Sequence, residues 1–326
     1  MELIKIEHLG ISFDSRTKKK EKVKILQDIN LSIEEGEVIA LVGESGCGKT
    51  TLGKTIVGLY PPSEGTIYYR GKDITKLNKK EYMDYRLGVQ MVHQDSFAAL
   101  NPNRTIFQSL SMPLMQNHIA KNKKEAEDIL KEYFTEVGLT PPEQFLYKYP
   151  HQLSGGQRQR ILLARALSVK PRVIVADEPV SMVDVSLRIA LIDLMTRMNQ
   201  KYKISFVYIT HDLATARYVA KDGRLAVMYL GRIVELNNIR EAIDNPKHPY
   251  FKALIAAVPS DIGRGRSEMK DLPLRSLDMP SVNNPPSGCS FHTRCPYYKD
   301  RCEKEIPKLR EFEGGMIACH FAEEIP

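Results

Sequence analysis

The sequence predicts an α/β protein with a mostly parallel sheet, an antiparallel β layer, an inserted helical subdomain and a small, loop-rich C-terminal extension that contains cysteines. Three observations favour this fold class. Short apolar runs alternate with helical patterns over residues 1–245, which is typical of α/β domains. A glycine-rich loop follows one of these runs, and two adjacent carboxylates follow another. After residue 245, prolines become frequent and the regular pattern fades.

The predicted strands differ in how their apolar residues are arranged. Residues 3–13 and 65–69 alternate more between apolar and polar, which suits an antiparallel layer with one exposed face. Three other runs are short and almost continuously apolar, which suits the buried central strands of a parallel sheet. These runs are residues 37–42, 172–176 and 204–209.

A helical insertion interrupts the strand pattern. Apolar residues recur at three- and four-residue spacings over residues 105–138, and two prolines end the run. We interpret residues 96–168 as a helical subdomain inside a nucleotide-binding domain of residues 1–245. The extension, residues 246–326, begins with one short predicted helix, 248–258, and shows little further regular pattern beyond its cysteines. No internal repeat is visible, so we expect a single nucleotide-binding domain.

Composition limits the class of protein. Of the 326 residues, 42% are hydrophobic and 27% are charged, as in ordinary soluble domains. No apolar run approaches the roughly 18–20 residues of a membrane span, and the N-terminus does not resemble a signal peptide, so we expect a cytoplasmic protein. The net charge of +7 is compatible with a nucleic-acid or membrane-surface partner. The basic runs at 18–20 and 121–124 lack interleaved aromatic residues, however, and favour solvated surface.

Residues 43–50 have the sequence Gly-Glu-Ser-Gly-Cys-Gly-Lys-Thr, which matches the G-x-x-x-x-G-K-[ST] pattern of a phosphate-binding loop. The match follows an apolar strand and precedes a predicted helix, 51–59, so it predicts a P-loop NTPase core. Backbone amides wrap the phosphates, Lys49 reaches the β- and γ-phosphates, and the Thr50 hydroxyl ligates Mg²⁺. Cys47 is expected to fill space without a chemical role. The residues predicted to bind the nucleotide here are Gly43, Glu44, Ser45, Gly46, Cys47, Gly48, Lys49, Thr50 and Thr51.

Polar residues follow three further predicted strands and supply the candidate catalytic groups. Asp177 suits a water-mediated contact with Mg²⁺, and Glu178 beside it can act as general base toward the attacking water. His211 lies at a strand end, the sheet edge where α/β proteins bind ligands, and we expect it to contact the γ-phosphate. Gln94 ends another apolar stretch and is placed to give an amide oxygen to the metal. Glu178, His211 and Gln94 are therefore the predicted catalytic residues.

The segment Leu153-Ser154-Gly155-Gly156-Gln157 predicts a second anion site, at the N-terminus of a helix. Its glycines remove side chains so that backbone N–H groups can approach an anion, and the serine adds a hydroxyl donor. Residues 157–167 then have a helical pattern. A plain glycine-rich turn before a helix is the alternative, but the nucleotide motifs that flank the segment argue against it.

Taken in order, these motifs resemble the Walker A, Q-loop, signature, Walker B, D-loop and switch histidine of ATP-binding-cassette (ABC) ATPases, over residues 4–236. The resemblance implies binding and hydrolysis of ATP with Mg²⁺. It implies that Phe13 stacks on adenine, with Arg16 or Ile25 as alternatives that could share this contact. In the family, two cassettes pair head to tail. The signature segment of one chain would then cap the γ-phosphate held by the Walker A loop of the other.

Further motifs narrow the resemblance to the ATPases of di-/oligopeptide and nickel importers. They are residues 43–49, 149–151, 176–181 and 248–259, together with the cysteine-rich tail. The resemblance implies a peripheral subunit on the cytoplasmic face of the cell membrane that energises uptake of dipeptides or oligopeptides. Its implied partners are a second ABC ATPase subunit, identical or paralogous, two transmembrane permease subunits that contact residues 94–104, and an extracytoplasmic peptide-binding protein within the complex. No nucleic-acid partner is implied.

The sequence departs from the family pattern at three points. Residues 181–184 are Ser-Met-Val-Asp where Ser-Ala-Leu-Asp is usual. The hydroxyl residue of the Walker A loop is Thr50 where Ser is common, and His93 precedes the Q-loop glutamine where Phe is frequent. None of these changes removes a catalytic group.

Four of the five cysteines lie in the last 38 residues. No Cys-x-x-Cys pair is present, so a zinc-ribbon pattern is not matched. On ligand type alone, four thiolates bind Zn²⁺ or a [4Fe–4S] cluster equally well. A disulfide is disfavoured in the cytoplasm, and unliganded thiols are disfavoured because the tail is too short for a core of its own. The family resemblance implies a [4Fe–4S] cluster, with Zn²⁺ as the alternative. His292 and His320 are adjacent candidates, and we expect them to lie beside the ligands or to be exposed. The implied ligands are Cys289, Cys295, Cys302 and Cys319.

A soluble ABC ATPase that acts on nucleic acid or ribosomes is the alternative function from another class. Such proteins usually carry two cassettes, long coiled-coil insertions or a strongly basic arm. This chain has one cassette and a helical insertion of ordinary size. A purely structural nucleotide-binding module is disfavoured because Glu178 and His211 are present.

Overall fold

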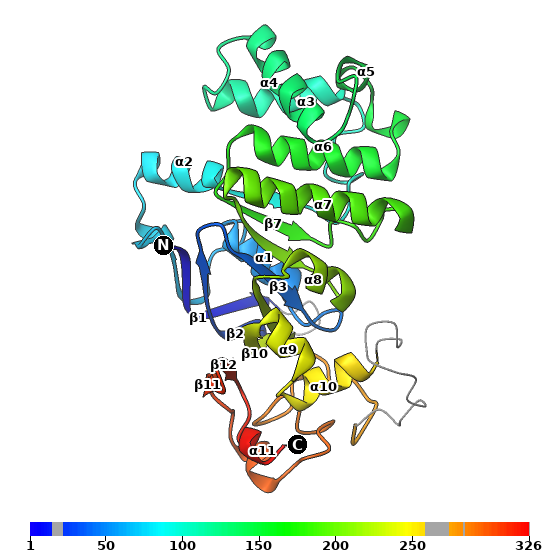
Figure 1. Cartoon of the computed structure of the whole chain (residues 1–326). Helices are drawn as coiled ribbons and strands as arrows, with labels where there is room; N and C mark the ends of the chain where they lie inside the picture. Colours follow the sequence, from blue (N-terminus) through cyan, green and yellow to red (C-terminus); the bar gives the residue numbers. More distant parts are fainter. Residues whose placement is uncertain (15–21, 258–273, 283, 326) are drawn as a thin grey trace. The chain divides into compact units, whose positions relative to one another are not determined.

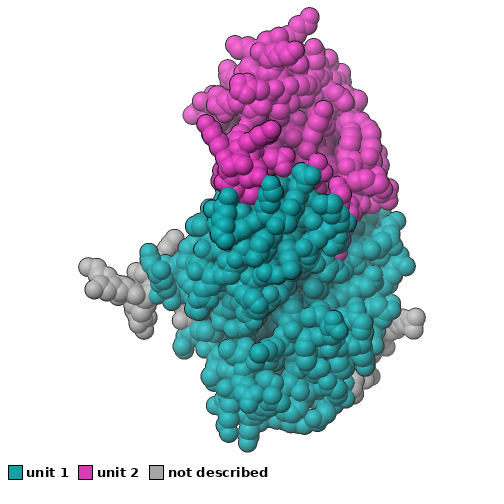
Figure 2. Space-filling view, turned by 90° about the vertical axis from the view of Figure 1, so that its left-hand side faces the viewer, with its two compact units in different colours: residues 1–34, 38–76, 208–326 teal, residues 35–37, 77–207 magenta. Residues whose placement is uncertain are grey.

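The computed structural model describes residues 1–14, 22–257, 274–282 and 284–325. Two compact units make up the chain, and Figure 2 shows them in different colours. Unit 1 contains residues 1–34, 38–76 and 208–326, and unit 2 contains residues 35–37 and 77–207. The predictions for Arg16 and for the lysines at 18–20 lie outside the described residues, as does residue 258 at the end of the predicted helix 248–258.

An antiparallel four-stranded sheet in unit 1 confirms the predicted antiparallel layer. Its strand order is β2-β1-β4-β5, and β1 pairs antiparallel with both β2 and β4. Ile4 and Ile6, two positions apart on β1, are both buried, as expected for one face of a strand. The strands are β1 (Glu2–Asp14), β2 (Lys22–Glu34), β4 (Glu64–Tyr69) and β5 (Lys72–Asp73), followed by the 3₁₀ turn η1 (Ile74–Lys76).

The apolar run of residues 37–42 forms β3 (Val38–Val42), a buried strand of unit 1. It pairs in parallel with β9 (Arg224–Tyr229), which pairs antiparallel with β10 (Arg232–Asn238). Two strands of the extension, β11 (Arg310–Phe312) and β12 (Gly315–Ile317), continue this sheet because β12 pairs with β10. The extension is therefore joined to the nucleotide-binding domain by main-chain hydrogen bonds.

The described part of the C-terminal extension beyond residue 274 is mostly loop, as predicted, but it contains short regular elements that the sequence pattern does not reveal. A short helix, α11 (Asp300–Lys304), precedes the β11–β12 hairpin, which is drawn in red in Figure 1. The hairpin turns at Glu313 and Gly314, whose φ angles of 45° and 80° suit a tight two-residue turn. Its strands are three residues long, too short to show a periodic pattern in the sequence. The 3₁₀ turn η3 (Ala322–Glu324) follows.

The helices of unit 1 begin and end at residues with identifiable roles. The predicted helix at 51–59 is α1 (Lys49–Ile56), which starts directly after the phosphate loop. It ends early because Gly58, with a φ of 72°, leads the chain out of the helix. Asp212 caps α8 (Leu213–Val219). The remaining helices are α9 (Ile239–Asp244) and α10 (Pro249–Ala256), which corresponds to the predicted helix 248–258.

One apolar core serves both the nucleotide-binding part of unit 1 and the extension. Phe291 and Cys295 of the extension pack in the same buried cluster as Val42 of β3 and Tyr229 of β9. Tyr250 of α10 lies in this cluster as well. These described residues of the extension thus pack in a core that they share with the nucleotide-binding part of unit 1.

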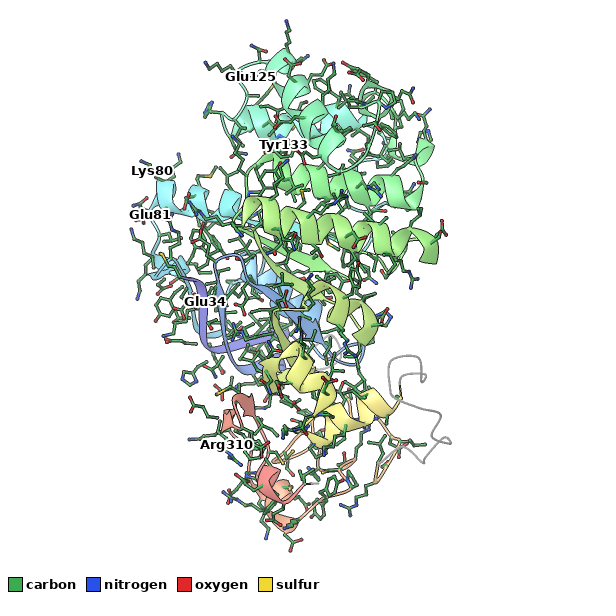
Figure 3. The ribbon with its side chains drawn as sticks, viewed as in Figure 1. Glu34, Lys80, Glu81, Glu125, Tyr133 and Arg310 are labelled. Carbon is green, nitrogen blue, oxygen red and sulfur yellow. The ribbon has the colours of Figure 1, made fainter. Side chains whose placement is uncertain are left out.

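Unit 2 contains a parallel strand pair and two flanking helices. β6 (Val89–Val92) and β7 (Val173–Asp177) pair in parallel, as predicted for the apolar run of residues 172–176. Asn78 caps α2 (Lys79–Gly88) in a reciprocal capping box with Glu81, which is labelled in Figure 3. α7 (Val185–Tyr202) leads toward β8 (Ser205–Ile209), which carries the chain from unit 2 back to unit 1. Among the described helices, none is both long and apolar enough to cross a membrane.

The helical insertion consists of several helices. The run at 105–138 is two helices, because Asn122 caps the start of the second. Tyr133 of that second helix is buried, and Figure 3 labels it. The helices are α3 (Ile106–Gln116), α4 (Lys123–Glu136), α5 (Glu143–Leu146), the 3₁₀ turn η2 (Pro150–Gln152) and α6 (Gly155–Ser168).

Candidate functional site

The phosphate loop lies between β3 and α1 and needs glycine at both of its ends. Gly43 has a φ of 152°, and a Cβ there would lie 2.2 Å from the carbonyl oxygen of Met228. Gly48 has a φ of 106°, and a Cβ there would lie 2.8 Å from Leu26 Cδ2. Both positions exclude a side chain because neighbouring strands approach the loop closely. The two motif glycines therefore serve the shape of the loop.

Lys49, the motif lysine, lies within the loop itself. It is buried, and its Nζ donates hydrogen bonds to the carbonyl oxygens of Gly43 at 2.6 Å and Glu44 at 3.0 Å. Cys47 is buried beside it, and burial raises the pKa of this thiol. The ammonium group of Lys49 therefore lies within the loop, bound to its carbonyl oxygens. Cys47 is buried with a protonated thiol.

Phe13, the predicted adenine contact, is 39% exposed at the end of β1. Its ring packs edge-on against Tyr60, with 5.2 Å between ring centroids. Tyr60 was not identified from the sequence. An aromatic residue shortly after the glycine that ends α1 was the available signal. The two rings form an aromatic pair in which Phe13 keeps an accessible surface.

The predicted catalytic carboxylate and the Q-loop glutamine lie together in unit 2. Asp177, the last residue of β7, is 3% exposed. Glu178 follows with a φ of 43°, a conformation that non-glycine residues seldom adopt and that is concentrated at functional sites. Gln94 Nε2 donates a 2.9 Å hydrogen bond to Glu178 Oε2. The Ser181 N–H and hydroxyl donate to the Glu178 carbonyl at 3.2 and 2.9 Å, so this glutamate is fixed at both its backbone and its side chain.

His211 lies in unit 1 between β8 and α8 and is exposed. The residue before it, Thr210, donates its N–H to the Leu41 carbonyl at 3.1 Å. The residue after it, Asp212, caps α8 through the N–H of Ala214 at 2.8 Å. The chain is thus fixed on both sides of the histidine, at the strand end where the sequence predicts it.

The signature segment forms the N-terminus of α6. Ser154 is the N-cap: its Oγ accepts from the Gln157 N–H at 3.3 Å, and Gln157 Oε1 accepts from the Ser154 N–H at 3.0 Å. A Cβ on Gly155 would lie 3.0 Å from the Met182 carbonyl oxygen. A Cβ on Gly156 would lie 3.3 Å from the side chain of Leu187. The two glycines therefore let α6 approach the loop that follows Glu178 and the first turn of α7.

Arg158, which we did not identify from the sequence, ties the signature segment to the chain after Gln94. It is buried, its Nη1 donates to the carbonyl of Leu153, and its Nε lies 3.4 Å from Ser96 Oγ. Its guanidinium carbon lies 3.4 Å from the centroid of the Phe97 ring. Burial lowers the pKa of Arg158. Helical periodicity alone does not reveal that a charged residue is buried.

The four cysteines of the extension line one small cavity, together with Phe291, His248, His292 and His320. Burial raises the pKa of Cys289 and of Cys295 to about 12, so these thiols are protonated. His292 is buried, with Nδ1 2.9 Å from the Cys289 carbonyl oxygen. Within the described residues, no three His, Cys, Asp or Glu side chains are grouped as metal ligands. The structure thus brings the predicted thiols to one cavity without a ligand arrangement.

Two further residues of the extension were missed by sequence reasoning. Tyr250 and Arg294 both contact Glu44 of the phosphate loop. They lie more than 200 positions from it in the sequence, and no local pattern connects residues at that separation.

Comparison with known protein families identifies both parts of the chain. Residues 26–181 match the family described as ABC transporter. Residues 234–302 match the family described as the C-terminal region of oligopeptide/dipeptide transporters.

Individual relatives match over almost the whole chain. The oligopeptide transport ATP-binding protein AppF of Bacillus subtilis is 41% identical over 300 residues, which is 91% of this chain and 89% of the relative. The oligopeptide transport ATP-binding protein OppF of Salmonella typhimurium is 37% identical and covers 97% of this chain and 95% of the relative. A dimeric ATP-binding cassette, solved in a post-hydrolysis state with ADP and Pi, has a TM-score of 0.62 at 28% identity. The match covers 73% of this chain and 99% of that structure.

The fold, the phosphate loop and the signature helix define the class: this is an ABC ATPase. Within that class, the chain belongs to the oligopeptide/dipeptide transporter family. It is the ATP-binding subunit of a peptide importer, and it hydrolyses ATP. Nothing in the comparisons favours the alternative of an ATPase that acts on nucleic acid or ribosomes.

Proposed function

We propose that ATP hydrolysis in this subunit depends on Glu178 as general base, with Gln94 holding its carboxylate in place. The 2.9 Å hydrogen bond between their side chains is the observation that carries this assignment. A carboxylate whose position is fixed by such a hydrogen bond is suited to accept a proton from the attacking water. The strained backbone at Glu178 fits a position selected for chemistry.

The remaining nucleotide contacts follow from the chemistry of each residue. The loop Gly43–Thr51 would bind the phosphates through its amides and Lys49, Phe13 would stack on adenine, and His211 would contact the γ-phosphate. Thr50, Asp177 and Gln94 carry the oxygen atoms suited to Mg²⁺, which would neutralise charge on the phosphates. All of these are residue types that the hydrolysis of a nucleoside triphosphate requires.

The subunit is proposed to act as one half of a cassette dimer, with an identical or paralogous chain as partner. The signature segment Ser154–Gln157 would complete the nucleotide site of the partner, because its helix N-terminus offers backbone N–H groups to an anion. The dimer would work on the cytoplasmic face of the membrane with two permease subunits and an extracytoplasmic peptide-binding protein. Phe97, 56% exposed, lies in the segment 94–104 proposed to meet the permeases.

We also propose that Cys289, Cys295, Cys302 and Cys319 hold a [4Fe–4S] cluster, with Zn²⁺ as the alternative. Support comes from four thiols on one cavity, a donor set that suits either group. Such a group would act as a crosslink within the extension. Iron, sulfide and zinc analysis of anaerobically purified protein distinguishes the two. An absorption spectrum gives a second test, because an iron–sulfur cluster absorbs visible light at about 400 nm. For replacement of any of the four cavity cysteines by serine, Cys47→Ser is the matched control, since Cys47 lies outside this cavity. Zinc without iron would refute the cluster.

Glu178→Gln tests the proposed base. Replacing the carboxylate with an amide removes the proton acceptor and should lower the ATPase rate of the assembled transporter by at least about 100-fold. ATP binding should persist. Glu143→Gln, a change at an exposed glutamate on α5, is the matched control and should leave the rate unchanged. Full-rate hydrolysis by Glu178→Gln would refute the assignment.

A further inference from the structure

Glu44, the second residue of the phosphate loop, is held by two residues of the C-terminal extension. Its N–H donates a 2.8 Å hydrogen bond to Tyr250 Oη. Its carboxylate accepts from Arg294 Nη1, with distances of 3.0 and 3.2 Å to the two oxygens. The extension therefore holds the loop at one residue through both the main chain and the side chain.

These contacts are largely shielded from water. The Arg294 side chain is 7% exposed and that of Glu44 is 24% exposed, while Tyr250 is buried. A charged hydrogen bond in such surroundings is stronger than one on the surface. Loss of one partner would leave the other charge poorly solvated and unpaired. Each contact thus constrains where the start of the loop can lie.

Arg294 belongs to the same short turn as two of the cysteines. The turn is closed by hydrogen bonds from the Arg294 and Cys295 N–H groups to the Phe291 carbonyl, at 3.0 and 2.9 Å. Cys289 and Cys295 line the thiol cavity, whereas the guanidinium of Arg294 pairs with the phosphate loop. Neighbouring residues of one turn therefore face the cavity and the loop.

Tyr250 is fixed from the strand side. Glu235, a buried residue of β10, accepts hydrogen bonds from the N–H groups of Lys247 and His248, the latter at 2.7 Å. His248 Nδ1 in turn accepts from the Tyr250 N–H at 3.1 Å. The ring of Tyr250 packs on that of Tyr229, with 4.5 Å between centroids. The Tyr250 hydroxyl that accepts from the Glu44 N–H is therefore fixed by the packed core, and its position does not depend on the phosphate loop.

We infer that Tyr250 and Arg294 are positioning residues for nucleotide binding, through which the cysteine-bearing extension sets the affinity of the phosphate loop for ATP. This inference rests on the proposed role of Gly43–Thr51 in binding phosphates. A loop that is already fixed loses less conformational freedom when it binds. Arg294 also neutralises the Glu44 carboxylate, which without that partner would repel a triphosphate. Neither residue touches the reacting atoms, so the effect falls on affinity and not on the chemical step.

Arg294→Met tests this inference because it removes the charge and keeps the length of the side chain. We expect the Kd for a fluorescent ATP analogue on the full-length chain to rise about 10-fold. In the assembled transporter the KM for ATP should rise by a similar factor while kcat at saturating ATP changes little. Arg294→Lys, which keeps the charge, should recover part of the affinity. Glu44→Gln combined with Arg294→Met should also recover part of it, because no unpaired carboxylate remains.

Arg310→Met is the matched control. Arg310, labelled in Figure 3, lies at the start of β11 in the same extension and pairs with Glu323 at 2.7 Å, without a contact to the loop. Its replacement should leave the ATP affinity unchanged. If Arg294→Met does not yield folded protein, Tyr250→Phe tests the other contact with Glu44, because it removes only the hydroxyl oxygen that accepts from the Glu44 N–H.

Two outcomes separate this inference from the assignment of the loop. If Lys49→Ala abolishes nucleotide binding while folded Arg294→Met and Tyr250→Phe bind as tightly as the parent, the inference is overturned and the loop assignment stands. If Lys49→Ala binds nucleotide normally, the loop assignment itself is refuted. An equal loss of affinity in Arg294→Met and Arg310→Met would indicate a general effect of the extension and would also overturn the inference.

Discussion

The two glycine-rich elements of this ATPase are held in opposite ways. In the phosphate loop, Gly43 packs against the backbone of Met228, and Glu44 is held by Tyr250 and Arg294. All three partners lie far along the chain. The shape of this loop is therefore a product of the whole of unit 1.

The hydrogen bonds that cap the signature segment come from its own neighbours, although its glycines also approach Met182 and Leu187. Ser154 and Gln157 cap each other three positions apart, and Arg158 turns back to the carbonyl of Leu153. Local contacts of this kind can form as soon as the helix forms. The comparison shows that the conformation of a sequence motif can depend on contacts with residues outside the motif.

The largest effect is expected at Gly43, where the long-range contacts are closest. Gly43→Ala would place a Cβ 2.2 Å from the Met228 carbonyl oxygen, so the loop and β9 must separate. We expect a loss of about 3 kcal/mol or more in the free energy of unfolding. Gly46→Ala in the same loop is the matched control: its Cβ would meet no atom within 4 Å, and the φ of 79° should cost only about 1 kcal/mol. Urea unfolding of both variants without nucleotide measures the difference, and equal losses would contradict the role of the close approach.

An intermediate effect is expected at Glu235, which supports Tyr250 through α10. Burial raises the pKa of Glu235 to about 7, so between pH 4.5 and 7 the folded protein holds a proton that the unfolded chain releases. The stability that this group contributes is present in full below about pH 4.5 and is lost as the pH rises through 7. Glu235→Gln carries no titratable group at this position. Its stability relative to the parent should therefore increase by about 1.4 kcal/mol for each unit by which the pH rises within this window. Unfolding curves at pH 5 and pH 7.5 test this, and a difference that does not change with pH would contradict it.

The smallest effect is expected at the signature, where a single local cap is lost. Ser154→Ala removes the N-cap of α6 and should cost about 1 kcal/mol of stability. Asn122→Ala removes a comparable cap from α4 and should cost about the same. ATP hydrolysis by the assembled transporter should fall only in Ser154→Ala, since only that cap belongs to the proposed composite site. A similar loss of activity in both variants would mean that the signature serine acts only through helix stability.

Sequence analysis predicted the parts of the molecule that depend on local pattern. The apolar runs became β3 and β7, and the glycine-rich loop lies between a strand and a helix as expected. The reciprocal cap of Ser154 and Gln157 was not predicted, although a serine followed three residues later by glutamine is its sequence signature.

The parts that could not be predicted depend on contacts between distant residues. Nothing in the sequence near Arg294 indicates that its partner is Glu44. The strands β11 and β12 are too short for a periodic pattern and are fixed by pairing with β10. Arg158 lies on a buried face of α6 that only tertiary packing reveals. The roles of the individual site residues stay predictions that the variants above can test.

The contact between Glu44 and Arg294 has a consequence for the synthesis of this protein. The two residues are separated by 250 positions. At about 5–20 residues per second, a ribosome needs roughly 12–50 s to travel from one codon to the other. For that interval the phosphate loop exists without its arginine partner, and unit 1 can close on it only after Arg294 has been made. A chain truncated or stalled before Arg294 would therefore carry the complete loop sequence without this ion pair, so that full nucleotide affinity is reserved for chains that include Arg294.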